Sequence, residues 1–162
     1  MSSSALPIAV GPGEGATIQG PAGGPLAFKV RGEHTNGTLT ALENAIAPGD
    51  GPPLHTHANE DEAWYVLEGE LRFRLGAELR GAPAGTFVFV PRGTPHCFQN
   101  VGRGSARVLV LFTPSGMERF STGSHRCRTA PTAEAFSNIG REVGMEVIGP
   151  PLAVSDPLAA HA

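Results

Sequence analysis

Short apolar runs separated by glycine and proline constrain the fold of this chain more than any other feature. The runs at 64–67, 71–75, 86–90 and 107–112 have the length of strands, and 22 glycines and 15 prolines supply turns between them. Many short strands with tight connections are typical of an all-β protein. The sequence therefore predicts an all-β fold.

Further strands are expected at 28–31, 39–46 and 96–100. The tripeptide Glu68-Gly69-Glu70 predicts a hairpin between the strands on either side of it. Gly102-Arg103-Gly104 predicts a second hairpin in the same way. Both predictions rest on glycine, which permits the sharp backbone turns that a hairpin needs.

A chain of 162 residues is most simply a single domain, in which we distinguish three parts. Residues 1–24 are predicted to be a flexible N-terminal arm, 25–150 a β-barrel with a C-terminal helical segment, and 151–162 a mobile tail. The helix is expected at about 133–143, with Thr132 as its cap and Gly144 just past its end. Gly140 inside this run could divide it into two pieces.

Charge and composition argue against several classes of function. The net charge is -3 and no cluster of Lys or Arg appears, so nucleic acid is not an expected partner. The start, Met1-Ser2-Ser3-Ser4, does not resemble a secretory signal, and no apolar stretch is long enough for a membrane span. We therefore expect a cytoplasmic protein without membrane contact, in which Cys97 and Cys127 are reduced thiols.

Two segments carry the residue types of a metal site. His55 and His57 are two positions apart and so point to the same side of a strand, Glu62 follows a short polar turn, and His96 comes from a distant strand. Three imidazoles and a carboxylate suit one divalent transition metal, Mn, Fe, Co, Ni, Cu or Zn, better than Mg or Ca. The alternative, that these histidines only fill a barrel interior, would suit one lone histidine better than this set.

Glu60, Asp61 and Glu62 are three candidate carboxylates. Glu62 has the same parity as Trp64 and should face the cavity, so we predict that it is the ligand. Glu60 and Asp61 are expected in a solvated acidic turn. Trp64, Phe73 and Phe98 are candidate residues of a substrate pocket, although phenylalanines are more often core than substrate contacts.

Several other polar residues are expected outside the site. His34, His125 and His161 are predicted to be surface residues, and Arg72 and Arg74 to form an exposed face. Cys97 alternates with His96 and should point away from the cavity.

The two segments resemble the paired motifs of the cupin superfamily, G(X)5HXH(X)4E(X)6G and G(X)5PXG(X)2H(X)3N. Every defining position is filled, by Gly49, His55, His57, Glu62 and Gly69, and then by Gly85, Pro91, Gly93, His96 and Asn100. The resemblance implies an antiparallel jelly-roll barrel of six to eight strands with the metal inside it. It also implies a homodimer that pairs through N-terminal strands and sheet faces.

Outside the motifs, 112–120 and 143–151 look like parts of the single-domain cupins grouped with bacterial quercetinases, which are flavonol dioxygenases. This resemblance implies a metal-dependent dioxygenase that takes a small enolisable aromatic substrate and O2. Glu62 would then be both a ligand and the general base. Two alternatives stay open: a cupin isomerase or cyclase of secondary metabolism, and a non-enzymatic module that binds a small ligand.

Overall fold

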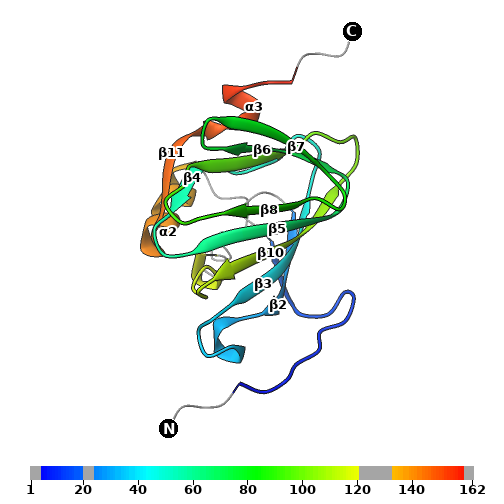
Figure 1. The fold of residues 1–162 in the computed structure, drawn as a ribbon, viewed down its shortest axis with the longest axis vertical. Helices are drawn as coiled ribbons and strands as arrows, with labels where there is room; N and C mark the ends of the chain where they lie inside the picture. Colours follow the sequence, from blue (N-terminus) through cyan, green and yellow to red (C-terminus); the bar gives the residue numbers. More distant parts are fainter. Residues whose placement is uncertain (1–4, 20–23, 121–132, 159–162) are drawn as a thin grey trace.

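The computed structural model describes residues 5–19, 24–120 and 133–158 as two antiparallel β-sheets that form a jelly roll (Figure 1). The six-stranded sheet has the order β1-β2-β3-β10-β5-β8, and the five-stranded sheet has the order β11-β4-β9-β6-β7. The strands are β1 (Ala16–Gln19), β2 (Pro25–Val30), β3 (Thr40–Ile46), β4 (Pro53–His57), β5 (Asp61–Glu68), β6 (Glu70–Leu75), β7 (Glu78–Pro83), β8 (Phe87–Val90), β9 (His96–Asn100), β10 (Ala106–Thr113) and β11 (Met145–Pro151). Short helices are η1 (Gly32–His34), α2 (Ala133–Glu142) and α3 (Leu152–Ser155). The predicted all-β fold with a short C-terminal helical segment is confirmed.

The core lies between the two sheets and follows strand alternation. On β5, Trp64 and Val66 are buried whereas Tyr65 is exposed, because successive side chains point to opposite faces. Trp64 packs edge-to-face against Phe73 of the opposite sheet, with ring centroids 5.2 Å apart. Alternation thus places one face of each sheet in a shared apolar interior.

Both predicted hairpins are wrong. Strands β5 and β6 lie in different sheets, since β5 pairs with β10 and β8 while β6 pairs with β7 and β9. Gly69, at φ 82°, lies where the chain crosses from one sheet to the other, and a Cβ there would approach Ala106 to 2.9 Å. Strands β9 and β10 are divided between the sheets in the same way. A glycine turn permits a sharp bend, but it does not determine which strands pair.

The structure has strands that were not predicted. Strand β7 forms a hairpin with β6, β1 pairs with β2, and β11 pairs with β4 so that Val147 lies opposite His55. Strand β1 falls within the predicted arm and α3 within the predicted tail. The division into arm, barrel and tail stays a prediction.

The predicted helix is present as one piece, α2, and Gly144 follows it at φ 79°. Phe136 and Gly140 of α2 are buried, and α2 lies beside β11 (Figure 1). A Cβ on Gly140 would meet the Met145 side chain at 2.5 Å, so close packing explains a glycine within the helix. Thr132, the predicted cap, lies outside the described residues.

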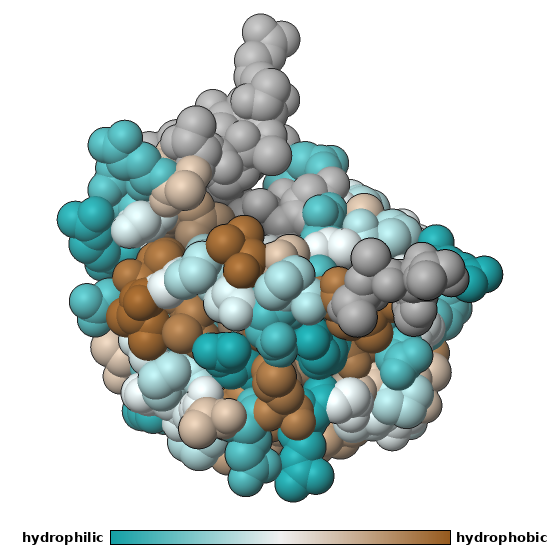
Figure 2. All heavy atoms as spheres, turned by 90° about the horizontal axis from the view of Figure 1, so that it is seen from above, coloured by the Kyte–Doolittle hydropathy of each residue, from teal (hydrophilic) through white to brown (hydrophobic). Residues whose placement is uncertain are grey.

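Helix α3 covers the outer side of the five-stranded sheet, which corrects the prediction that Arg72 and Arg74 form an exposed face. Both arginines are only partly exposed, and the Arg72 guanidinium lies 3.2 Å from Asp156 Oδ2. Cys97 lies on β9 of the same sheet and is fully buried, and burial raises the pKa of its thiol to about 11. The end of the molecule that carries α3 presents apolar side chains as separate patches among polar ones (Figure 2).

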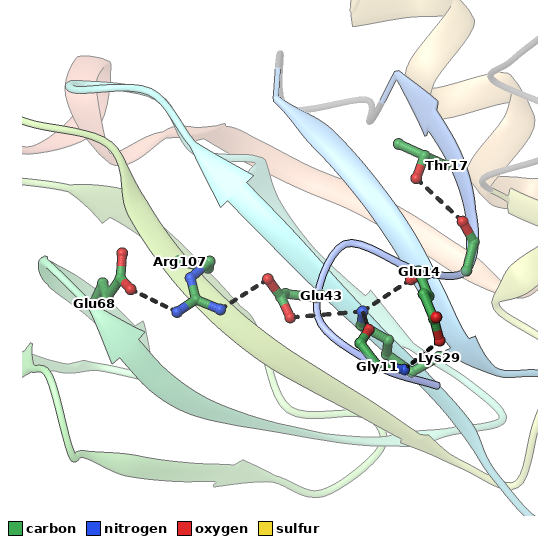
Figure 3. A network of polar contacts seen from close by, with 8 residues as sticks. Gly11, Glu14, Thr17, Lys29, Glu43, Glu68 and Arg107 are labelled. Carbon is green, nitrogen blue, oxygen red and sulfur yellow. Dashed lines mark hydrogen bonds and ion pairs between the residues drawn. The ribbon is translucent and has the colours of Figure 1, made fainter. Parts of the chain in front are cut away.

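The outer face of the six-stranded sheet carries both charged and aromatic side chains. Arg107 bridges Glu43 and Glu68, and Lys29 adds contacts to Glu43 and to the backbone of Glu14 (Figure 3). Surface ion pairs of this kind add little stability, but here they join the N-terminal segment to four strands of the sheet, β2, β3, β10 and β5. Tyr65, Phe87 and Phe89 are exposed on β5 and β8. Pairing of two copies through sheet faces stays a prediction.

No helix among residues 5–19, 24–120 and 133–158 has the length and apolar character needed to cross a membrane.

Candidate metal centre

The structure brings the four predicted ligands together inside the barrel. His55 and His57 come from β4 and His96 from β9, all in the five-stranded sheet, whereas Glu62 comes from β5 in the other sheet. Strands β4 and β9 are in register at the pair His55 and His96. One nitrogen or oxygen atom of each residue lies within 4.8 Å of those of the others, and all four side chains are buried.

Backbone carbonyls orient two of the imidazoles. His55 Nδ1 lies 2.7 Å from the Pro53 carbonyl oxygen, and His96 Nδ1 lies 2.8 Å from that of Thr94. A carbonyl oxygen only accepts, so Nδ1 donates in each case and Nε2 is presented to the cluster. Hydrogen bonds of this kind fix the tautomer of metal-binding histidines.

His57 lacks such a partner. His57 Nε2 lies 2.9 Å from Glu62 Oε2, but the two ring nitrogens are buried without an aligned hydrogen bond to any described residue. Glu62 Oε2 is also 3.1 Å from His96 Nε2. Nitrogen and oxygen lone pairs that converge on one point are what a shared ion would require.

The protonation states of His55 and Glu62 suit metal binding, whereas burial of His96 is outweighed by the contact with Glu62, which raises the pKa of His96. Burial, together with the neighbouring His96 and His57, lowers the pKa of His55 to about 3, so this imidazole is neutral near pH 7. Burial alone would raise the pKa of Glu62, but close contacts with His57 and His96 outweigh it and hold the pKa at about 2. The Glu62 carboxylate is therefore ionised. Metal ligands must be neutral imidazoles and ionised carboxylates, and this pair meets that condition.

The cluster fits one ion. Bonds of about 2.1 Å can reach ligand atoms up to about 4.2 Å apart, which is close to the spread of these atoms. The buried His and Glu cluster is thus compatible with a transition-metal site, and four protein ligands leave a fifth or sixth position for another molecule.

The two neighbouring acidic residues, Glu60 and Asp61, lie in different environments. The prediction that Glu60 lies in a solvated turn is wrong. Asp61 accepts hydrogen bonds from the backbone and side chain of Arg92, which lower the pKa of its carboxyl group. Glu60 was expected to be solvated, but it is only 2% exposed and burial raises its pKa. The segment that leads into β5 is covered by other parts of the chain, which its acidic composition could not reveal.

Two residues of the second motif, Gly93 and Asn100, help to hold β4 and β9 in place. Gly93, at φ 79°, donates its backbone N–H to the His57 carbonyl oxygen at 2.7 Å. The Asn100 amide donates to the carbonyl oxygens of Ile46 and Gly104 and accepts from the Gly102 N–H. The motif positions that are not ligands therefore fix the strands that carry ligands.

A cavity of about 90 Å³ opens beside the cluster. Trp64 and Phe98 line it, together with His55, His57 and Glu62. Phe73 lies behind these walls, with its ring 5.2 Å from Trp64 and 5.6 Å from Phe98. The cavity is mainly apolar, as sites for small molecules usually are.

Asn44 also lines the cavity, and the sequence analysis did not single it out. Its signal was present in the alternation of β3, where Asn44 shares a face with the buried Leu42 and Ile46. Among the other histidines, His34 is partly exposed and accepts a hydrogen bond from the Arg31 N–H. His125, His161 and Cys127 lie outside the described residues.

Comparisons with known proteins agree with this fold and cluster. An uncharacterized protein of Methanocaldococcus jannaschii is 32% identical over 48% of this chain, and the tetracenomycin polyketide synthase protein TcmJ of Streptomyces glaucescens is 34% identical over 49%. Quercetin 2,3-dioxygenase of Bacillus subtilis is 34% identical over 42% of the chain. The matches span 63%, 52% and 20% of these relatives' own lengths.

Solved structures share the fold. An RmlC-like cupin from Shewanella frigidimarina has a TM-score of 0.59 at 18% identity, covering 71% of this chain and 98% of its own. The polyketide cyclase RemF from Streptomyces resistomycificus has a TM-score of 0.57 at 20% identity, covering 68% of this chain and 81% of its own. Residues 43–112, which include all four clustered side chains, match the family model described as a cupin domain. Through residues 43–112 and its jelly-roll fold, this chain is similar to cupin proteins.

Proposed function

We propose that this protein is a metal-dependent dioxygenase that acts on a flavonol or a related enolisable aromatic molecule. The observation that carries the proposal is the buried cluster of three imidazoles and one ionised carboxylate, which opens directly onto an apolar cavity with aromatic walls. The distant homologue named quercetin 2,3-dioxygenase supports the same class of reaction.

The chain's own residues would have two roles, to hold the metal and to accept a proton from the substrate. His55, His57 and His96 would hold the metal, which when bound supplies a Lewis acid for the substrate's enolate oxygen. Glu62 is ionised, and contacts with His57 and His96 occupy Oε2, so Oε1 is left to accept the hydroxyl proton of the substrate. Trp64 and Phe98 exclude water and hold the ring of the substrate flat.

The test is substrate-dependent oxygen consumption. Samples loaded anaerobically with Mn, Fe, Co, Ni or Cu are mixed with flavonols and other enols and followed with an oxygen electrode. Oxygen should be consumed in proportion to the substrate lost. Glu62→Gln should lower turnover by about 10²–10⁴-fold on metal-matched samples, whereas Glu68→Gln, at a surface ion pair, should not.

A cyclase or isomerase acting on a polyketide is the second candidate. Its support is the sequence match to a polyketide synthase protein. The same cluster would serve a non-oxidative reaction through its Lewis acid alone. Conversion that proceeds equally well without oxygen would reject the dioxygenase and favour this candidate. Tight binding without conversion for every enol and every metal would favour a binding module.

A further inference from the structure

Asn44 is a polar side chain in an otherwise apolar part of the barrel wall. It lies on β3 with its side chain buried, only 8% exposed, and it lines the same cavity as the metal cluster. Its register partners on the two adjacent strands are Leu26 and Val108, both buried and apolar. The Oδ1 atom has no hydrogen-bond partner among the residues that the structure describes.

Asn100 is also buried, but unlike Asn44 it has a structural role that its side-chain hydrogen bonds explain. Its amide makes three hydrogen bonds to backbone groups and joins the ends of β3 and β9 to the loop that leads into β10. A buried acceptor without a partner is unfavourable for folding. No hydrogen bond among the described residues offsets the free-energy cost of burying the Asn44 Oδ1 atom. Asn44 lines the cavity, so its amide group is available to a molecule that binds there.

The sheet register places Asn44 far from the cluster. Glu62 pairs with Phe112, and Phe112 pairs with Thr40, which precedes Asn44 by four positions on β3. Four residues along a strand span about 13 Å, and two strands across a sheet span about 10 Å. Leu42, Trp64 and Val110 line the cavity between these two points. A molecule that touches both the cluster and Asn44 must be elongated.

We propose that Asn44 is a specificity-determining residue, whose Oδ1 accepts a hydrogen bond from a hydroxyl group on the end of the substrate remote from the metal. This inference rests on the proposed function and narrows it to elongated aromatic substrates with a distal hydroxyl. The enolic end binds at the cluster, the rings lie between Leu42 and Trp64, and the distal hydroxyl donates to Asn44.

The experiment compares the binding of three flavonols to zinc-loaded protein, because Zn²⁺ has no redox chemistry and should not support their oxidation. The probes are 3-hydroxyflavone, 3,7-dihydroxyflavone and 3,4′-dihydroxyflavone, which share the chelating end and differ in the distal hydroxyl. Affinities come from titration calorimetry, with the fluorescence of Trp64, the single tryptophan, as a second readout. One of the dihydroxy probes should bind about ten-fold or more tightly than 3-hydroxyflavone.

Asn44→Leu and the smaller Asn44→Ala should remove that preference and leave the affinity for 3-hydroxyflavone within about three-fold of wild type. Asn44→Leu should also keep or raise the melting temperature, whereas Asn100→Leu should lower it. Equal binding of all three probes, or a hydroxyl preference that survives in the folded variants, would overturn the inference and leave the proposed function intact. Failure of every probe to bind wild-type protein would reject the flavonol-type function itself.

Discussion

At the scale of single residues, Glu118 joins three segments of the chain through one carboxylate. It accepts hydrogen bonds from the Gly32 N–H, the Thr40 hydroxyl and the Gly116 N–H. Burial alone would raise the pKa of Glu118, but these hydrogen bonds outweigh it and lower the pKa below 4.5. The adjacent Met117 lines the cavity, so this carboxylate also positions part of the cavity wall.

We predict that Glu118→Gln lowers the free energy of unfolding by about 1–2 kcal/mol at pH 7, because the charge-assisted hydrogen bonds are lost. A carboxyl group with a lowered pKa in the folded protein stabilises it fully above the unfolded value of 4.5. That stabilisation is lost as the pH falls through the folded-state pKa. Denaturant melts of both proteins should therefore differ most above pH 4.5 and converge in acid. A difference that is constant with pH would contradict this account.

At this scale the candidate ligands could be predicted and the burial of Asn44 follows from alternation, but the burial of Glu60 could not be predicted. Strand alternation is local, so it determines that His55 and His57 share a face and that Glu62 faces the same way as Trp64. The burial of Glu60 depends on segments that are distant in sequence, as does the apolar surrounding of Asn44. Such long-range contacts leave no signal in the neighbouring residues.

At the scale of elements, the turn that precedes β4 determines where two of the ligands lie. The Gly49 N–H donates to the Asn100 carbonyl oxygen, and the Asn100 N–H donates to the Asp50 carbonyl oxygen, so the turn extends the end of β9. Gly51 packs directly on this strand, and a Cβ at Gly51 would lie 1.8 Å from the Phe98 carbonyl oxygen. No side chain fits at this position.

We predict that Gly51→Ala destabilises the protein by about 1–3 kcal/mol, because the added methyl group must push β4 away from β9. Metal content should fall with it, since β4 carries His55 and His57. Thermal melts and elemental analysis check the two effects. Gly81→Ala, on the exposed strand β7 where a Cβ meets nothing within 4 Å, is the matched control and should change neither quantity. Normal metal content and stability in Gly51→Ala would contradict this prediction and show that the turn can shift without displacing β4.

The existence of most strands could be predicted, but their partners could not. Alternation and turn residues locate β3, β5 and β6 to within a few residues. The sheet in which a strand lies depends on how the whole chain folds back on itself, so β5 and β6 belong to different sheets although only Gly69 separates them. Strand β7 was missed because its residues are mostly exposed and do not alternate between apolar and polar.

At the scale of the whole molecule, the cluster links the two sheets. His55, His57 and His96 belong to one sheet and Glu62 to the other, so an ion bound by all four would connect both halves of the barrel. Binding to the folded state alone stabilises that state by mass action. Metal affinity and folding stability are therefore coupled in this protein.

We predict that zinc at one hundred times its dissociation constant raises the free energy of unfolding of metal-free protein by about 2.7 kcal/mol. For a chain of this size the melting temperature should rise by about 5–10 °C. His57→Ala should lose most of this shift, whereas His34→Ala, which changes a partly exposed histidine outside the cluster, should keep it. Calorimetric melts with zinc and with a chelator measure the effect. An equal shift in both variants would mean that zinc binds elsewhere.

For protein design and for evolution, the division of the ligands between two sheets makes the centre modular. Backbone hydrogen bonds fix two of the three imidazoles, those of His55 and His96, whereas the carboxylate comes from a single position on β5. Position 62 can therefore be recoded, for example as Asp, His or Gln, without moving the register of β4 and β9. A single codon at the seam of the barrel would then be enough to exchange the proposed acid–base group while the proposed anchor of the ion is inherited unchanged.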